Sequence, residues 1–261
     1  MNIFNVVITG ATRGIGLGMA HAFLARGHRV MICGRAKSSM NAALDELHEF
    51  YGKQRVAGQI CDLSNYDDVQ KLWNTTVKQF GDVDIWVNNA GMSTANKPLW
   101  EQNPNDINAV VQTNMTGLMY GCSVAIGGML KQGYGWVYNM EGLGSNGMIT
   151  PGMLVYGSTK SALTYLTEGL VKETKKTPVK VGFLSPGMVV TDLLLTSSNG
   201  RKSKIFNVLA DRVETVAPWL VEQMLANDKH GAKIAWLTKG KIWRRFLTAP
   251  FSRRNVFEPS K

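Results

Sequence analysis

Short apolar runs rich in β-branched residues alternate with longer segments of helical period along the whole chain, and this alternation constrains the fold most strongly. It is the pattern of βαβ units, in which crossover helices join parallel strands. The runs are nearly continuous in Val and Ile, as expected for strands that helices cover on both faces. We predict strands at Asn5–Thr9, Arg29–Cys33, Val56–Ile60, Ile85–Val87, Trp136–Met140, Val179–Leu184 and Ala232–Trp236. We predict helices at Gly14–Ala25, Met40–Tyr51, Tyr66–Phe80, Ile107–Leu130, Val155–Lys172 and Val213–Leu225.

The sequence therefore predicts an α/β fold of the Rossmann type, a doubly wound parallel sheet of seven strands with helices on both faces. A chain of 261 residues with 44% hydrophobic residues can bury a large core without cross-links. Because no repeat or linker interrupts it, residues 1–261 are predicted to form a single domain.

Two segments break the alternation. Residues 191–210 are polar and follow the sixth strand, where ligands of open α/β sheets bind, so we predict a loop that covers a substrate. An ordinary surface loop is the alternative. Residues 229–261 form a basic extension, because nine basic residues and one acid give +8 of the chain's net charge of +10.

The composition excludes several classes of protein. Cys33, Cys61 and Cys122 are too few for a disulfide framework and favour a reducing compartment, and four scattered histidines make a metal site improbable. No apolar run reaches the ~18 residues of a membrane span, and the N-terminus has no signal-peptide pattern. We therefore predict a cytoplasmic protein without a metal, whose membrane contact, if any, is peripheral.

A glycine-rich turn follows the first predicted strand and opens the first helix. It reads Thr9-Gly10-Ala11-Thr12-Arg13-Gly14-Ile15-Gly16. Glycines let the backbone turn tightly and approach a pyrophosphate, whose charge the helix start favours. The order of strand, glycines and helix indicates a dinucleotide site, with a purely structural turn as the alternative.

The residues after the second strand indicate which dinucleotide binds. A free ribose hydroxyl would call for Asp or Glu about 20 residues beyond the glycines. That place holds Gly34, followed by Arg35, with Arg13 in the turn and Lys37 nearby. Guanidinium groups suit a 2′-phosphate, so the sequence predicts NADPH/NADP+ as the cofactor; arginines that only solvate the surface are the alternative.

Tyr156 and Lys160 stand four residues apart near the start of a predicted helix, so their side chains share one face. A nearby cation favours the phenolate form, and a tyrosine tuned in this way can give a proton to a carbonyl oxygen while hydride arrives at the carbon. The spacing is common by chance, so an exposed pair is the alternative.

Further motifs accompany this pair in order: Asp62-Leu63, Asn89-Ala90-Gly91, Asn114, and Pro186-Gly187 with Thr191. With the glycine turn they resemble the short-chain dehydrogenase/reductase family across nearly the whole chain. The resemblance implies that Tyr156 is the general acid/base, that Lys160 lowers its pKa and binds the nicotinamide ribose, and that Asn114 holds a water of a proton relay. It implies cofactor contacts from Gly10, Thr12, Arg13, Gly14, Ile15, Gly16, Arg35, Asp62, Leu63, Asn89, Ala90, Gly91, Tyr156, Lys160, Pro186, Gly187, Val189 and Thr191.

The chain departs from the family at one catalytic position. Most members carry a Ser thirteen residues before the Tyr, where this chain has Leu143. Strand register points instead to Glu141-Gly142, which has no hydroxyl either. Glycines could let the loop bring Ser145 to that place, and we predict Ser145 for the role; Thr150, or no hydroxyl at all, are the alternatives.

This departure narrows the resemblance. Asn139–Ser145 and Lys233–Thr238 are similar to the chlorophyll b reductases, which reduce a ring formyl group to a hydroxymethyl. The resemblance implies reduction of an aldehyde or ketone of a bulky hydrophobic substrate, with the formyl group of chlorophyll b or a related pigment as one candidate. A general carbonyl or 3-oxoacyl reductase and a non-catalytic NADP(H)-binding protein are the alternatives.

The basic extension contains an amphipathic segment that could lie on a lipid headgroup layer. Its apolar residues Ile242, Trp243, Phe246 and Leu247 share a helical face beside Lys241, Arg244 and Arg245. The alternative is that this face packs beside the substrate loop or on another subunit. No nucleic-acid motif accompanies the charge. The family resemblance implies a homodimer or homotetramer formed through Ile107–Leu130 and Val155–Lys172.

Overall fold

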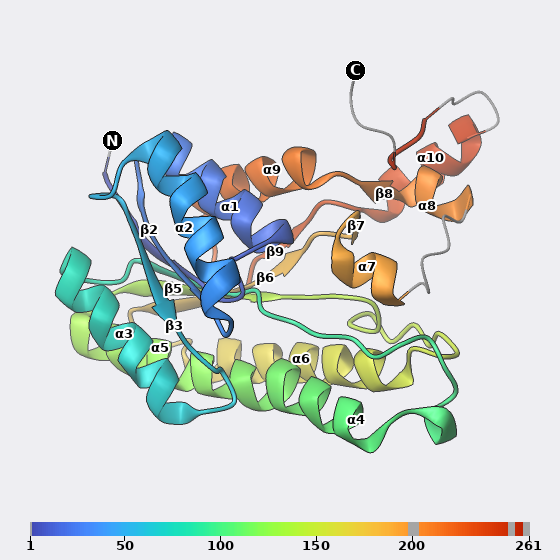
Figure 1. Ribbon diagram of the computed structural model, residues 1–261, viewed down its shortest axis with the longest axis horizontal. Coiled ribbons are helices and arrows are strands. Elements are labelled where there is room, and N and C mark those ends of the chain that lie inside the picture. The colour runs from blue at the N-terminus through green and yellow to red at the C-terminus, as the bar shows by residue number, and fades with distance from the viewer. Residues whose placement is uncertain (1, 198–203, 250–253, 258–261) are drawn as a thin grey trace.

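Seven parallel strands form one sheet in the order β3-β2-β1-β4-β5-β6-β9 in the computed structural model, which describes residues 2–197, 204–249 and 254–257 (Figure 1). Every strand predicted from the sequence is present, so the predicted fold class is confirmed. The strands are β1 (Asn5–Ile8), β2 (Arg29–Gly34), β3 (Val56–Ile60), β4 (Ile85–Asn88), β5 (Gly135–Met140), β6 (Val179–Ser185) and β9 (Lys233–Ala235).

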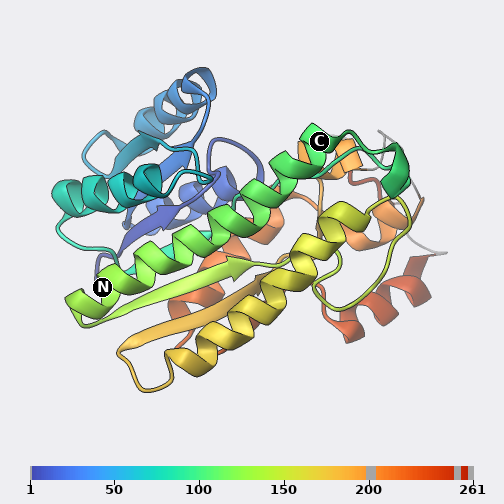
Figure 2. The same cartoon turned by 90° about the horizontal axis from the view of Figure 1, so that it is seen from below.

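Helices cover both faces of the sheet, as the continuous apolar strands require. On one face lie α1 (Gly14–Ala25), α2 (Lys37–Tyr51) and α9 (Val213–Ala226). On the other lie α3 (Tyr66–Phe80), α5 (Gly117–Gln132) and α6 (Leu154–Glu173), with α5 and α6 running across the same face of the sheet (Figure 2).

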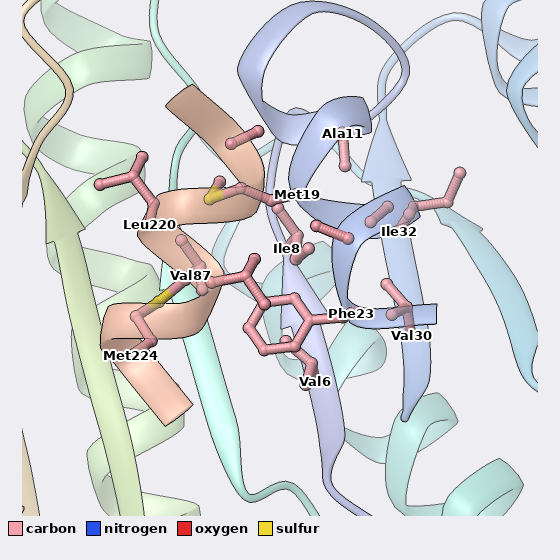
Figure 3. Close-up of a cluster of buried hydrophobic side chains, with 14 of the residues drawn as sticks. Val6, Ile8, Ala11, Met19, Phe23, Val30, Ile32, Val87, Leu220 and Met224 are labelled. Atoms are coloured by element: carbon pink, nitrogen blue, oxygen red, sulfur yellow. The ribbon is translucent and has the colours of Figure 1, made fainter. Parts of the chain in front are cut away.

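The core has one buried cluster on each side of the sheet. In the first, Phe23 of α1 and Met224 of α9 pack on Val6, Ile8 and Val87 of the strands (Figure 3). Gly18 lets α1 and α9 approach closely, because a side chain there would collide with Val213. Within the described part of the chain, no helix is long and apolar enough to cross a membrane.

The prediction of one continuous helix at Ile107–Leu130 is wrong, because the segment is divided into two helices. The structure has α4 (Pro104–Val111), a π-helical turn (Gln112–Thr116) and then α5. A π turn carries one more residue than an α turn, and such turns occur frequently at functional sites. Asn114 lies inside it and is held by the backbone of Met92, a contact that the helical period does not encode.

The segment predicted as a loop at residues 191–210 contains more regular structure than expected. It holds α7 (Asp192–Ser197), α8 (Lys204–Leu209) and β8 (Ala210–Asp211), which pairs with β7 (Met188–Val189). Residues 198–203 of the predicted loop lie outside the described residues. The basic extension contains α10 (Lys239–Thr248). The hydroxyl of Thr238, the residue before the helix, caps it by accepting from the Lys241 N–H.

The strand order reverses at the neighbours β1 and β4, where ligands of open α/β sheets bind beyond the carboxyl ends. The glycine turn follows β1 and Asn89 follows β4. The topology therefore brings the two predicted cofactor motifs together.

Candidate active site

The glycine turn packs directly against the segment after β4. Gly10 has a φ of +62°, and a Cβ on it would lie 2.7 Å from the Cα of Ala90. A Cβ on Gly16 would lie 2.5 Å from Asn89 Nδ2. Side chains are therefore excluded at both positions, and the backbone is left bare on the side where a pyrophosphate would approach.

Asn89 and Thr9 lock this turn in place. The side-chain amide of Asn89 donates to the carbonyls of Thr9 (2.9 Å) and Gly10 (3.1 Å). The Thr9 hydroxyl accepts from the backbone N–H groups of Asn89 (3.0 Å) and Ala90 (3.1 Å). The predicted cofactor residue Asn89 thus shapes the cradle through the backbone. The start of α1 at Gly14 has no side-chain cap, so its N–H groups are available to an anion.

The surroundings of Gly34 fit a 2′-phosphate rather than a free ribose hydroxyl. A Cβ on Gly34 would lie 2.7 Å from the Thr12 methyl group, so the turn leaves no room for the carboxylate of an NAD site. Arg35 is exposed and its guanidinium donates to the sulfur of Met92 at 3.2 Å. Arg13 forms an exposed ion pair of 3.4 Å with Asp192, and such pairs are weak enough to be exchanged for a phosphate.

The residues predicted to flank the rest of the cofactor lie along the same edge of the sheet. Asp62 accepts from the backbone N–H (3.0 Å) and hydroxyl (2.8 Å) of Ser64 just after β3, and Leu63 is buried. Thr191, which follows β6, lies beside the glycine turn. A Cβ added to Gly14 would be 3.4 Å from the Thr191 methyl group. Also after β6 lie Pro186, Gly187, which has a φ of +72°, and Val189, which is buried in β7.

Tyr156 and Lys160 are both buried in the first turns of α6, so the structure excludes the exposed pair. The Lys160 ammonium lies 5.7 Å from the centre of the Tyr156 ring and donates to the carbonyl of Met140 at 2.9 Å. It would lie 3.8 Å from a Cβ on Gly91. The pair therefore lies beside the segment Asn89–Gly91, which we call the cofactor wall because the predicted cofactor contacts Asn89, Ala90 and Gly91 form it.

Burial determines the protonation of both groups. It raises the pKa of Tyr156 to about 12. It lowers the pKa of Lys160 to about 8, while the negative charge of Glu141 acts in the opposite direction. This differs from the predicted lowering of the tyrosine pKa by Lys160. The reason is that desolvation of the buried phenol disfavours its ionised form, so Tyr156 carries its proton.

Asn114 connects the cofactor wall to α6. Its carbonyl oxygen accepts from the N–H of Met92 and its amide donates to the Met92 carbonyl, both at 2.8 Å. The amide also donates to the Thr159 hydroxyl at 3.1 Å. The side chain is thus occupied by protein partners, and its role in a proton relay stays a prediction.

The loop after β5 places Gly142, and not Ser145, at the tyrosine. A Cβ on Gly142 would collide with the Tyr156 hydroxyl, as the strand register anticipated. The hydroxyl of Ser145 accepts from the Gly142 N–H (3.0 Å) and donates to the Lys160 carbonyl (3.2 Å). The catalytic role predicted for Ser145 therefore has no support from this geometry. Thr150 lies further along the loop, where its carbonyl accepts from the Met153 N–H.

Sequence reasoning missed an ion pair behind this loop. The carboxylate of Glu141 is buried and lies 2.8 Å from the ammonium of Lys233, the first residue of β9. An acid directly after a buried apolar strand was the available signal, because a carboxylate there needs a partner.

The amphipathic segment of the basic extension leaves its apolar face uncovered by the described residues. Trp243 of α10 is 69% exposed, and Phe246 and Leu247 are exposed as well. On the other side, Arg245 donates to the buried carboxylate of Asp211 at 2.9 Å, which anchors the helix. Arg245 also donates to the carbonyl of Leu209 at 3.0 Å, so α10 lies beside α8 of the predicted substrate segment, while Trp243, Phe246 and Leu247 stay exposed.

Comparison with known proteins gives one family. The short chain dehydrogenase family profile matches residues 5–202. The probable chlorophyll(ide) b reductase NYC1 of Oryza sativa subsp. japonica is 39% identical over 97% of this chain and 54% of its own length. The chlorophyll(ide) b reductase NOL of Arabidopsis thaliana is 40% identical over 97% of this chain and 73% of its own length. The chain thus spans about half of the NYC1 protein.

Solved structures agree on the fold. ElxO with NADP bound superposes with a TM-score of 0.79 at 26% identity, covering 93% of this chain and all of that one. A 3-ketoacyl-(acyl-carrier-protein) reductase from Brucella melitensis, complexed with NADH, has a TM-score of 0.79 at 24% identity and covers 89% of this chain and 96% of its own.

The predicted cytoplasmic location is wrong by this comparison, because the NYC1 and NOL relatives are chloroplastic proteins. The prediction depended on the first residues of the given sequence, and these do not determine the compartment in which a protein works.

Proposed function

The chain belongs to the short-chain dehydrogenase family, and on this premise we propose that it is an NADPH-dependent oxidoreductase that reduces a carbonyl group to an alcohol. The observation that carries the proposal is the buried Tyr156–Lys160 pair beside the bare glycine turn, at the carboxyl edge of the sheet. NADPH, when bound, supplies the hydride. Gly10, Gly14, Gly16 and the wall at Asn89–Gly91 would hold it, with Arg35 and Arg13 at the 2′-phosphate.

The chain's own residues supply the proton. Tyr156 is protonated because of its burial, which is the form that a general acid needs for reduction. As negative charge develops on the substrate oxygen, the phenol can donate to it. Lys160 places a positive charge beside the ring, and this charge stabilises the phenolate that remains after transfer.

We propose a bulky hydrophobic substrate, with a formyl-bearing chlorophyll as the first candidate. The chlorophyll(ide) b reductases similar to this chain support the pigment. The loop between β5 and α6 supports the hydrophobic class, because Met148 and Ile149 are exposed there. The Lys97 N–H donates to the Gly152 carbonyl at 3.3 Å, so the segment that carries exposed Trp100 runs beside the same loop.

The test follows NADPH absorbance with a panel of a formyl-bearing chlorophyll, a simple aromatic aldehyde and a 3-oxoacyl thioester. We expect oxidation of NADPH with the chlorophyll, and a loss of at least ~10²-fold in Tyr156→Phe with NADPH binding retained. NADPH binding without turnover on any carbonyl would instead identify a non-catalytic binding protein. Turnover restricted to the thioester would identify a 3-oxoacyl reductase.

We further propose a peripheral contact between α10 and an anionic lipid surface. Exposed Trp243, Phe246 and Leu247 stand beside exposed Lys239 and Arg244, which is the composition of an interfacial helix. Sedimentation with phosphatidylglycerol vesicles, but not with phosphatidylcholine vesicles, is the expected result, and Trp243→Gln should weaken it. Equal recovery in the supernatant with both lipids would contradict this contact.

We also propose that the chain forms a homodimer or homotetramer through α5 and α6. The helices α5 and α6 lie on the same face of the sheet (Figure 2). Tyr165 of α6 is 83% exposed, and Met119 and Leu130 of α5 are exposed as well. Light scattering should give a multiple of the 28.7 kDa chain mass, and Tyr165→Lys should reduce it. A single-chain mass at micromolar concentration would contradict this assembly.

A further inference from the structure

Glu141 lies between the two residues that contact the proposed catalytic pair. The carbonyl of the preceding residue, Met140, accepts from the Lys160 ammonium at 2.9 Å. The following residue, Gly142, lies over the Tyr156 hydroxyl. The Glu141 N–H donates to the carbonyl of Leu184 on β6 at 2.7 Å, so the backbone is fixed at this point.

The Glu141 side chain is buried, and its partner comes from the edge of the sheet. Its carboxylate is 2% exposed and lies 2.8 Å from the ammonium of Lys233, which is 50% exposed. A carboxylate removed from water is strongly destabilised unless a charge or hydrogen bonds compensate it. Lys233 provides that compensation from β9, the strand next to β6.

Further charged groups lie near this pair on the solvent side. Glu141 and Lys233 line an open surface pocket of about 410 Å³. Glu168 and Lys172 of α6 line it as well, and Glu168 is exposed. Toward the interior, the ammonium of buried Lys160 lies 2.9 Å from the carbonyl of Met140, the residue directly before Glu141. Three charged side chains therefore follow one another from the surface inward, with alternating sign: half-exposed Lys233, buried Glu141 and buried Lys160.

A buried ammonium without a counter-charge tends to lose its proton. Burial lowers the pKa of Lys160 to about 8, and Glu141 is the charged group that raises it. A neutral Lys160 would no longer stabilise the phenolate of Tyr156. The charge of Glu141 therefore bears on the proton transfer through Lys160.

We propose that Glu141 is a positioning residue that keeps Lys160 in its ammonium form, and that the ion pair with Lys233 holds the Glu141 side chain in place. The significance of this arrangement for turnover rests on the proposed reductase function. The effect of the Glu141 charge on the protonation of Lys160 does not depend on that function, and it can be measured in the protein without substrate.

The test is a pH titration of the protein labelled with ¹³Cε-lysine, followed by NMR, with Lys160→Gln used to assign the Lys160 signal. In the unmutated protein we expect a midpoint near pH 8. Glu141→Gln, which keeps the shape but not the charge, should lower this midpoint by about one pH unit. Glu168→Gln removes an exposed carboxylate from the same pocket and should leave the midpoint unchanged.

A folded Glu141→Gln protein with an unshifted Lys160 midpoint would overturn the proposal, as would an equal shift in Glu168→Gln. If Glu141→Gln does not fold, Glu141→Asp decides, because it keeps the charge on a shorter arm. A Lys160 midpoint below that of the unmutated protein supports the proposal, and one equal to it or higher overturns it.

Turnover gives a second, separate readout. The alkaline limb of the rate of NADPH oxidation should move to lower pH in Glu141→Gln, by an amount similar to the NMR shift, and should be restored in part by Glu141→Asp. Absence of carbonyl reduction in the unmutated protein would refute the reductase function and leave the NMR result to judge the effect of the Glu141 charge on Lys160.

Discussion

Gly142→Ala should disable the tyrosine and leave the glycine turn of the cofactor site unchanged. The backbone of Gly142 has an ordinary φ, so alanine is allowed there, and the effect comes from space alone. The added Cβ would collide with the Tyr156 hydroxyl and lie 3.1 Å from both Tyr156 Cζ and Lys160 Cε. Carbon atoms in ordinary contact are about 3.5–4.0 Å apart, so the phenol or the loop must move by ~1 Å.

A displacement of ~1 Å at a reacting group can lower the rate by ~10²-fold, which corresponds to about 2.7 kcal/mol in the barrier. The same collision should lower the free energy of unfolding by about 1–3 kcal/mol. The assay is NADPH oxidation with the best carbonyl of the panel, together with NADPH affinity from fluorescence titration.

The matched control is Gly169→Ala on α6, where nothing lies within 4 Å of an added Cβ. It should keep full turnover and gain a few tenths to about 1 kcal/mol of helix stability. If Gly142→Ala kept full turnover while folded, the tyrosine would not work at the position seen here. If it lost NADPH affinity to the same extent as turnover, the damage would not be local to the phenol.

The remaining predictions concern cofactor choice, the loop and the C-terminal anchor. NADPH should bind at least about tenfold more tightly than NADH, and Arg35→Ala should remove most of this preference; equal affinities in the unmutated protein would refute it. Ser145→Ala should lower the free energy of unfolding by about 1 kcal/mol and turnover by less than tenfold, and Thr150→Ala should be milder; a loss of ~10²-fold at unchanged stability would restore the catalytic role of Ser145. Burial alone would raise the pKa of Asp211, but Arg245 and its neighbours hold it below its usual value. Asp211→Asn should therefore cost about 2 kcal/mol in urea unfolding at pH 7, and the difference should shrink as the pH falls below about 4; a cost independent of pH would contradict the ion pair.

The elements that were predicted correctly depend on short stretches of sequence. Strand runs and helical periods are read from neighbouring residues, and each predicted strand of the sheet was found. The glycine turn also depends on local geometry, because Gly10 needs a positive φ. Tyr156 and Lys160 are one helical turn apart, so their common face follows from the helix itself. The sequence by itself therefore determines the sheet, the glycine turn and the common face of Tyr156 and Lys160.

Only the tertiary structure determines the contacts between residues that are far apart in the chain. Glu141 and Lys233 are 92 positions apart and meet because β9 pairs with β6, next to β5. The π turn at Asn114 depends on the Met92 backbone, which belongs to another strand's loop. In the loop after β5, Gly144 has a φ of +101° and turns the chain so that Ser145 faces the Lys160 carbonyl. Local composition predicted a flexible loop there, but its path is selected by packing against α6, and that packing exists only once the sheet has formed.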